Sequence, residues 1–170
     1  MKHLLLSILI PLPLLFGCGE AGKTVHELIG FISSTLEMPE TMLCVEKGHV
    51  SIYHYDQGHP TLVYYYGPDE CSDCAIGRMA RNMELLDWGE QSGLFSVMHI
   101  MAPMEDRTEE VIERLLKSDF DFPVYIDNDY ILEDQSVIPK DSRLHAFMLD
   151  HKGKPSLTLI YHKPIKQSLL

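Results

Sequence analysis

The chain has 170 residues, of which 45% are hydrophobic, so it is long enough to bury the core of one domain. Acidic residues dominate its charge, because 25 Asp and Glu against 14 Lys and Arg give a formal net charge of -11. Such a chain lacks the basic stripe that holds a phosphate backbone, and an anionic membrane surface repels it. We therefore expect one globular domain and no nucleic-acid partner.

The first residues have the pattern of an export signal. Lys2 gives a short positive start, and Leu4 to Phe16 form an apolar run of signal-peptide length. The run is shorter than the ~20 apolar residues that a membrane-spanning helix needs. We therefore expect residues 1–17 to be a cleaved signal peptide and not a transmembrane anchor.

The segment Leu15-Phe16-Gly17-Cys18 closes this signal. It resembles the lipobox of bacterial lipoproteins, in which the cysteine is acylated and becomes the mature N-terminus, although Phe16 replaces the small residue usual there. The resemblance implies a lipid on Cys18 and a tether over residues 18–23. It also implies a location in the bacterial cell envelope, with the outer membrane facing the periplasm preferred over the inner membrane. The alternative is an unmodified cysteine after an ordinary signal peptide.

Residues 24–60 form an N-terminal extension with two predicted parts. Apolar residues recur at three- and four-residue spacing from Val25 to Leu36, which predicts an amphipathic helix. From Met42 to Tyr55 apolar and polar residues alternate around Gly48, which predicts a β-hairpin. A helix and two strands are thus expected ahead of the main domain.

The main domain begins with an alternation of strands and helices. Thr61 to Tyr66 is a continuous β-favouring run, typical of a buried strand. An amphipathic segment from Cys74 to about Gln91 predicts a helix, and Leu94 to Met101 predicts a second buried strand. Asp106 and Glu109 have the spacing of a capping box, which predicts the start of the next helix.

Further strands are predicted at Phe122–Ile126, Leu144–Leu149 and Pro155–Tyr161, with a turn over Asp150–Gly153 between the last two. Right-handed crossovers make the earlier strands parallel, and the terminal hairpin adds antiparallel strands. Residues 61–170 are therefore expected to fold as an α/β domain with a central mixed β-sheet flanked by helices.

Cys71 and Cys74 lie where the first strong strand gives way to the first strong helix. Unpaired N–H groups and the positive end of the helix dipole stabilise a thiolate there, and a three-residue step lets two sulfurs close a disulfide. A C-x-x-C also supplies half of a zinc site, but His49, His54 and His59 lack the spacing of a second ligand pair. We therefore expect a redox dithiol that uses no metal or cofactor.

Four segments are similar to the thioredoxin-like superfamily, and more narrowly to TlpA-like and redoxin-like lipoproteins of the bacterial envelope. They are Leu62–Tyr66, Cys71–Cys74, Phe122–Val124 with Asp127, and Phe147–Asp150 with Gly153. The similarity spans roughly Thr61 to Ser156 and implies a thioredoxin-like fold with the C-x-x-C at the N-terminus of the first core helix. It also implies that Cys71 is the exposed attacking thiol and Cys74 the resolving thiol.

One departure from this family pattern precedes the first cysteine of the pair. Glu70 stands where the family usually has an aromatic residue, with Asp69 and Asp73 beside it. Nearby carboxylates disfavour a second negative charge, so they are expected to oppose the helix dipole at Cys71. The resulting hypothesis is a reductant or a slow exchanger.

A second departure concerns the cis-proline that normally faces the dithiol and shapes the substrate groove. Leu144 or His145 occupies that place, and the nearest proline, Pro139, is several residues earlier. Leu144 and His145 are therefore the candidate substrate-groove residues. A peroxidase is disfavoured, because Pro68 stands where the peroxiredoxin pattern needs Thr or Ser.

Two residues outside the dithiol have both a structural and a functional interpretation. His99 lies on an apolar strand, where a packed or hydrogen-bonded role is favoured over catalysis. Cys44 is expected to be a buried apolar residue, and its alternative role is a third redox thiol.

The leading hypothesis is an envelope-anchored thiol-disulfide oxidoreductase. Its partners would be protein thiols or disulfides in the periplasm, an unidentified redox partner, and the membrane through the lipid anchor. The alternative is a non-catalytic thioredoxin-fold lipoprotein that serves as a binding or structural module. Glu70 and the absent cis-proline favour that alternative.

Overall fold

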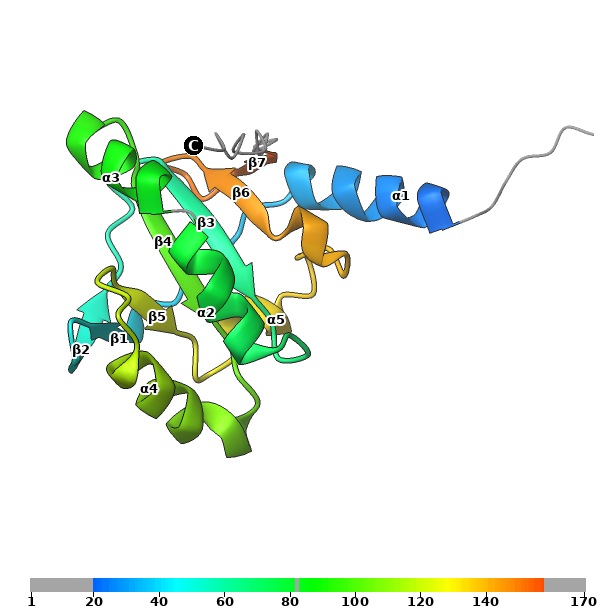
Figure 1. The fold of residues 1–170 in the computed structure, drawn as a ribbon. Coiled ribbons are helices and arrows are strands. Elements are labelled where there is room, and N and C mark those ends of the chain that lie inside the picture. Colours follow the sequence, from blue (N-terminus) through cyan, green and yellow to red (C-terminus); the bar gives the residue numbers. More distant parts are fainter. Residues whose placement is uncertain (1–19, 82, 158–170) are drawn as a thin grey trace, which may run out of the picture.

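The computed structural model describes residues 20–81 and 83–157 of the chain. Its centre is one seven-stranded mixed β-sheet with helices packed around it (Figure 1). The signal peptide, the lipidated Cys18 and the end of the last strand, all predicted above, lie outside the described residues. Within the described part, no helix combines the length and the apolar character that crossing a membrane requires.

The sheet is built from strands that follow the predicted order. They are β1 (Thr41–Glu46), β2 (His49–His54), β3 (Thr61–Tyr66), β4 (Ser96–Met101), β5 (Val124–Ile126), β6 (Ala146–Leu149) and β7 (Pro155–Leu157). The helices are α1 (Glu20–Ser33), α2 (Ser72–Arg81), α3 (Met83–Ser92), α4 (Thr108–Lys117) and α5 (Ile131–Asp134). Two short 3-10 turns accompany them, η1 (Glu105–Arg107) and η2 (Ser142–Leu144).

The strand order is β2-β1-β5-β4-β3-β6-β7. The inner pairs β3 with β4 and β4 with β5 are parallel, whereas β6 and β7 form an antiparallel hairpin beside β3. The β1–β2 hairpin of the N-terminal extension joins the opposite edge through β5. A parallel βαβ core with a terminal antiparallel hairpin is the thioredoxin-like arrangement, so the predicted fold class is confirmed.

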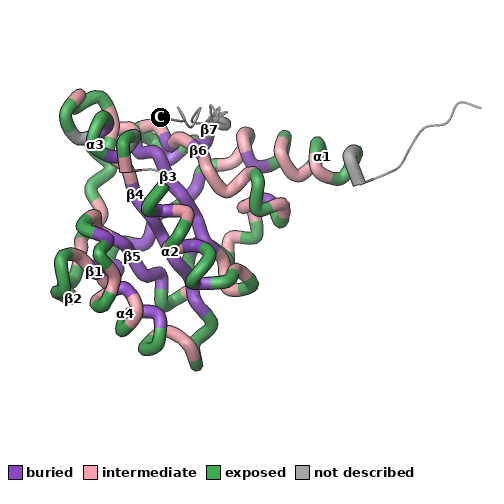
Figure 2. The backbone as a smooth tube through the Cα atoms, viewed as in Figure 1, coloured by how far each residue is buried: buried purple, intermediate pink, exposed green. Residues whose placement is uncertain are grey.

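Strand β3 lies at the centre, and all six of its residues are buried (Figure 2). Side chains alternate along a strand, so Leu62, Tyr64 and Tyr66 pack on the face covered by α2, α3 and α4. Val63 and Tyr65 pack on the other face, against residues of α1 and α5. Burial on both faces explains why this segment is apolar or aromatic at every position after Thr61.

Both predicted hairpins are confirmed, and glycine is needed in each turn. Lys47 and Gly48 have φ of 47° and 77°, the left-handed pair of a two-residue type I′ turn. Gly153 has φ of 73°, and a Cβ there would lie 2.6 Å from the carbonyl oxygen of Leu36. The Leu36 N–H donates a hydrogen bond of 2.8 Å to the Gly153 carbonyl, which fastens the β6–β7 turn to the segment after α1.

Helix ends differ from the predicted ones in three places. The helix predicted from Cys74 to Gln91 starts earlier, with α2 at Ser72, and α1 already includes Glu20, ahead of the predicted Val25. The predicted capping box is wrong, because Arg107 occupies the N-cap position of α4 without a side-chain hydrogen bond. The turn η1 replaces it, since the Thr108 N–H donates to the backbone carbonyl of Glu105.

Candidate functional site: a cysteine pair at a helix start

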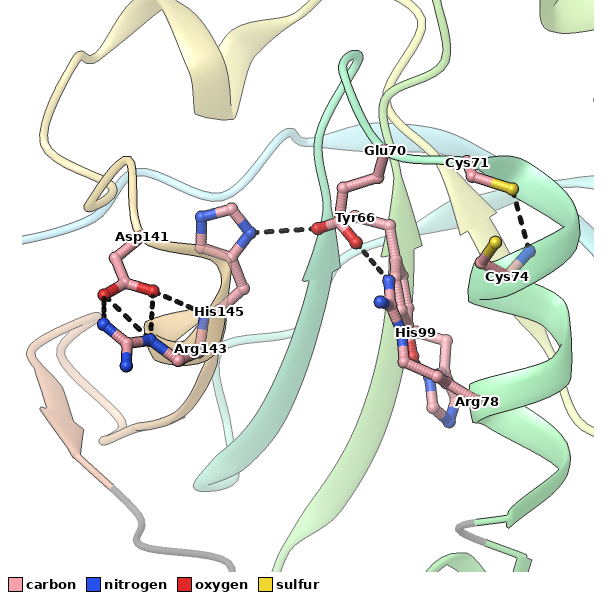
Figure 3. Close-up of polar contacts among 9 residues, drawn as sticks. All are labelled: Tyr66, Glu70, Cys71, Cys74, Arg78, His99, Asp141, Arg143 and His145. Carbon is pink, nitrogen blue, oxygen red and sulfur yellow. Dashed lines mark hydrogen bonds and ion pairs between the residues drawn. The ribbon is translucent and has the colours of Figure 1, made fainter.

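The two cysteines lie at the junction of β3 and α2. The Ala75 N–H donates a hydrogen bond of 2.9 Å to the Cys71 carbonyl, so Cys71 occupies the N-cap position of α2. The Cys74 N–H donates to the Cys71 sulfur at 3.3 Å (Figure 3). Both side chains are free thiols and exposed. The chain thus places the pair at the start of the first core helix, as the resemblance implies.

The two thiols are electrostatically unequal. The pKa of Cys71 is lowered, first by a hydrogen bond from the Cys74 thiol and then by the Cys74 backbone N–H. The pKa of Cys74 is raised, first by its hydrogen bond to Cys71 and then by burial. A thiolate attacks disulfides whereas a thiol does not, so Cys71 is the better nucleophile of the two.

Two of the three carboxylates around Cys71 are paired with arginines. Asp73 forms an ion pair with Arg114 of α4, and Glu70 forms one with Arg78 of α2. Asp73 does raise the pKa of Cys71, as expected from the sequence. The pKa of Cys71 is nevertheless lowered overall, because the two hydrogen bonds from Cys74 outweigh the effect of Asp73.

Glu70 also reaches His145, the residue at the predicted cis-proline place. The His145 Nδ1 lies 3.2 Å from a Glu70 oxygen, and its Nε2 donates to the Pro139 carbonyl at 2.7 Å. Figure 3 shows the Glu70 carboxylate between the imidazole of His145 and the guanidinium of Arg78. Burial raises the pKa of Glu70, but hydrogen bonds from His145 and Arg78 reverse this, and the net pKa is lowered. The residue is therefore held as a carboxylate.

Glu70 and His145 lie between two hollows next to the loop that leads to Cys71. One has a volume of about 300 Å³ and the other about 480 Å³, and Glu70, Ser142 and His145 line both. The candidate groove residue His145 therefore faces the cysteine loop, whereas Leu144 lies in η2 and lines neither hollow. No peptide bond in residues 20–81 or 83–157 is cis.

Sequence reasoning missed the link between Glu70 and His145, because 75 positions separate the two residues. It treated Glu70 as a charge beside Cys71 and His145 as a candidate substrate-groove residue. The one available signal was that a carboxylate and an imidazole, which can carry opposite charges, stand at two places that the family pattern brings near each other.

The remaining candidates lie away from the dithiol. His99 is buried in β4, where its Nδ1 lies 3.1 Å from the Tyr66 hydroxyl, so the structural interpretation is favoured. Cys44 is buried in β1, and its pKa is raised mainly by burial. In the described residues, no three His, Cys, Asp or Glu side chains gather in a way that could hold a metal ion.

Fold and site together define a thioredoxin-like architecture with a C-x-x-C pair at the first core helix. No protein-family model matches the chain, and no curated protein matches it.

Solved structures similar to the chain include the following three. The mitochondrial 2-Cys peroxiredoxin of Plasmodium falciparum has 10% identity and a TM-score of 0.46, with 73% of this chain and 81% of that chain covered. StoA of Bacillus subtilis has 17% identity and a TM-score of 0.46, with 70% and 86% covered. The thioredoxin domain of a thiol-disulfide oxidoreductase from Bacteroides vulgatus has 16% identity and a TM-score of 0.44, with 73% and 86% covered.

Proposed function

We propose that this protein is a thiol-disulfide oxidoreductase that acts on protein thiols or disulfides through Cys71 and Cys74. The observation that carries the proposal is the hydrogen bond of 3.3 Å from the Cys74 N–H to the Cys71 sulfur at an exposed helix N-terminus. That position favours the thiolate of Cys71, while the pKa of Cys74 is raised. One nucleophile and one protonated resolving thiol are the two parts that dithiol exchange requires.

In the reducing direction, the Cys71 thiolate attacks one sulfur of a substrate disulfide. A bond forms between Cys71 and that sulfur, and the second substrate sulfur leaves as a thiolate that takes up a proton. Cys74 then loses its proton and attacks Cys71, so the first substrate sulfur leaves in turn. Two electrons pass to the substrate, and a Cys71–Cys74 disulfide remains for a dithiol reductant to reopen.

The test is a trapping experiment in intact cells. Cys74→Ala removes the resolving thiol, so mixed disulfides between Cys71 and its partners are expected to accumulate. Cys71→Ala is the matched control and should trap nothing. The companion assay is disulfide reduction by the purified wild-type chain. If there are no trapped species and no reductase activity, the proposal fails, and a non-catalytic binding or structural module takes its place.

We propose further that a lipid on Cys18 anchors the chain in the bacterial envelope, at the outer membrane facing the periplasm. The support is the lipobox-like Leu15-Phe16-Gly17-Cys18 after an apolar run of signal-peptide length. The wild type should be labelled by a fatty-acid probe and sediment with outer-membrane vesicles, whereas Cys18→Ser should do neither. Equal labelling and sedimentation of the two chains would contradict the anchor.

A further inference from the structure

The smaller of the two hollows is lined by several arginines. Three of the five arginines of the chain line it: Arg78 and Arg81 from α2, and Arg143 from η2. Residues Tyr64 to Tyr66 of β3 line it as well, and His145 stands at its border with the larger hollow. In a chain with a formal net charge of -11, this is an unusual concentration of positive side chains.

The guanidinium charges of the hollow are only partly neutralised. Arg78 pairs with Glu70, and Arg143 forms a two-pronged contact with Asp141, in which its Nη2 lies 2.5 Å from a carboxylate oxygen. Among the side chains that the structure describes, no carboxylate forms an ion pair with Arg81. Its charge still acts on the hollow, because it lowers the pKa of Tyr66 against the larger effect of burial. One guanidinium is therefore open to an outside anion.

The hollow is lined by close neighbours of the two cysteines, although neither cysteine lines it. Glu70 directly precedes Cys71, and Arg78 follows Cys74 by one helical turn. The positive charge of Arg78 acts on the Cys74 thiol and lowers its pKa, against larger effects that raise it. Figure 3 shows Arg78 running alongside Tyr66 on the same side of α2 as the Cys74 sulfur. A substrate held at Cys71 would therefore lie near Arg78, with Arg81 about one turn further along α2.

We propose that this hollow is a subsite for a carboxylate carried by the thiol or disulfide substrate. The proposal rests on the proposed function, because it assigns a substrate class to that same dithiol. Guanidinium groups match the planar, two-oxygen geometry of a carboxylate, and acidic side chains and free C-termini are the anions that a peptide disulfide carries. The carboxylate comes either from a small acidic thiol such as glutathione or from an acidic segment of a protein.

The test compares the attack of Cys71 on an anionic and an uncharged disulfide. Dithiobis(nitrobenzoate) carries two carboxylates and dithiodipyridine carries none, and both release a coloured thiol. In Arg81→Gln the ratio of the anionic rate to the uncharged rate should fall about threefold, the size expected of an exposed ion pair, and high salt should remove the difference. Arg107→Gln, outside the hollow, is the matched control and should keep the wild-type ratio. An unchanged ratio in Arg81→Gln, or an equal fall in Arg107→Gln, would overturn the subsite.

A second comparison separates the two sources of the carboxylate. Glutathione disulfide is set against a longer peptide disulfide with glutamates beside its cysteine, and against the glutamine version of that peptide. If Arg81→Gln slows the reaction with glutathione disulfide, the carboxylate comes from a small thiol. If it slows only the reaction with the glutamate peptide, the carboxylate comes from a protein segment. Dependence with neither would overturn the proposal. These rates need only the first attack by Cys71, so they can fail or succeed independently of the trapping experiment.

Discussion

Acid should destabilise the fold through His99, which is buried with no counter-charge beside it among the described residues. The imidazole is 1% exposed, stacks on the Tyr64 ring at 4.9 Å between centroids, and contacts the Tyr66 hydroxyl through Nδ1. Its Nε2 has no hydrogen-bond partner among the described residues. Burial lowers the pKa of His99 from 6.5 to about 3.

The sign and size of the effect follow from proton linkage. The unfolded chain binds a proton on this imidazole near pH 6.5, whereas the folded chain binds it only near pH 3, so stability falls as the pH drops through that window. Between about pH 7.5 and about pH 5 the loss from His99 alone is about 2 kcal/mol. That is a large share of the 5–15 kcal/mol typical of a domain.

Urea unfolding of the wild type and of His99→Phe at these two pH values measures the effect. The variant is expected to lose about 2 kcal/mol less than the wild type on acidification, whatever its stability at neutral pH. His49→Gln removes an exposed histidine of β2 and serves as the control. Parallel pH dependences of the wild type and His99→Phe would refute the reasoning.

Two further predictions concern a turn and the dithiol. Gly153→Ala should lower the free energy of unfolding in urea by about 2–4 kcal/mol, because a Cβ there clashes with the Leu36 carbonyl and the backbone is left-handed. Gly48→Ala should lower it by only about 1–2 kcal/mol, because that backbone is left-handed but has open space around it. Arg114→Gln should raise the pKa of Cys71, measured by thiolate absorbance, because the aspartate it pairs with then acts on the sulfur unopposed. Lys117→Gln on the same helix should leave that pKa unchanged, and a shift of equal size there would contradict the local explanation.

Much of the fold could be predicted because its signals are local. The run from Leu62 to Tyr66 is apolar or aromatic at every position, which is typical of a strand buried on both faces of a sheet. The turn at Lys47 and Gly48 is likewise encoded by adjacent residues. The start of α4 could not be predicted in the same way, because a 3-10 turn and a capping box both satisfy free N–H groups.

For the candidate site too, only the features with local sequence signals could be predicted. Cys71 and Cys74 are recognisable because their spacing and their position before a helix are sequence properties. The pairing of Glu70 with His145, and of Asp73 with Arg114, depends on how distant segments pack. Charge near a cysteine can be read from the sequence, but whether a counter-charge compensates it cannot.

The cap of α2 has a consequence for the stability of the protein in its two redox states. The Cys71 sulfur accepts the Cys74 N–H, so in the reduced state the nucleophile also fastens the first turn of the helix. Disulfide formation takes the negative charge from that sulfur and weakens its hold on the N–H group. The free energy of unfolding and the reduction potential are therefore linked in one thermodynamic cycle. Any substitution that stabilises the thiolate-capped turn shifts the reduction potential upward by the same free energy.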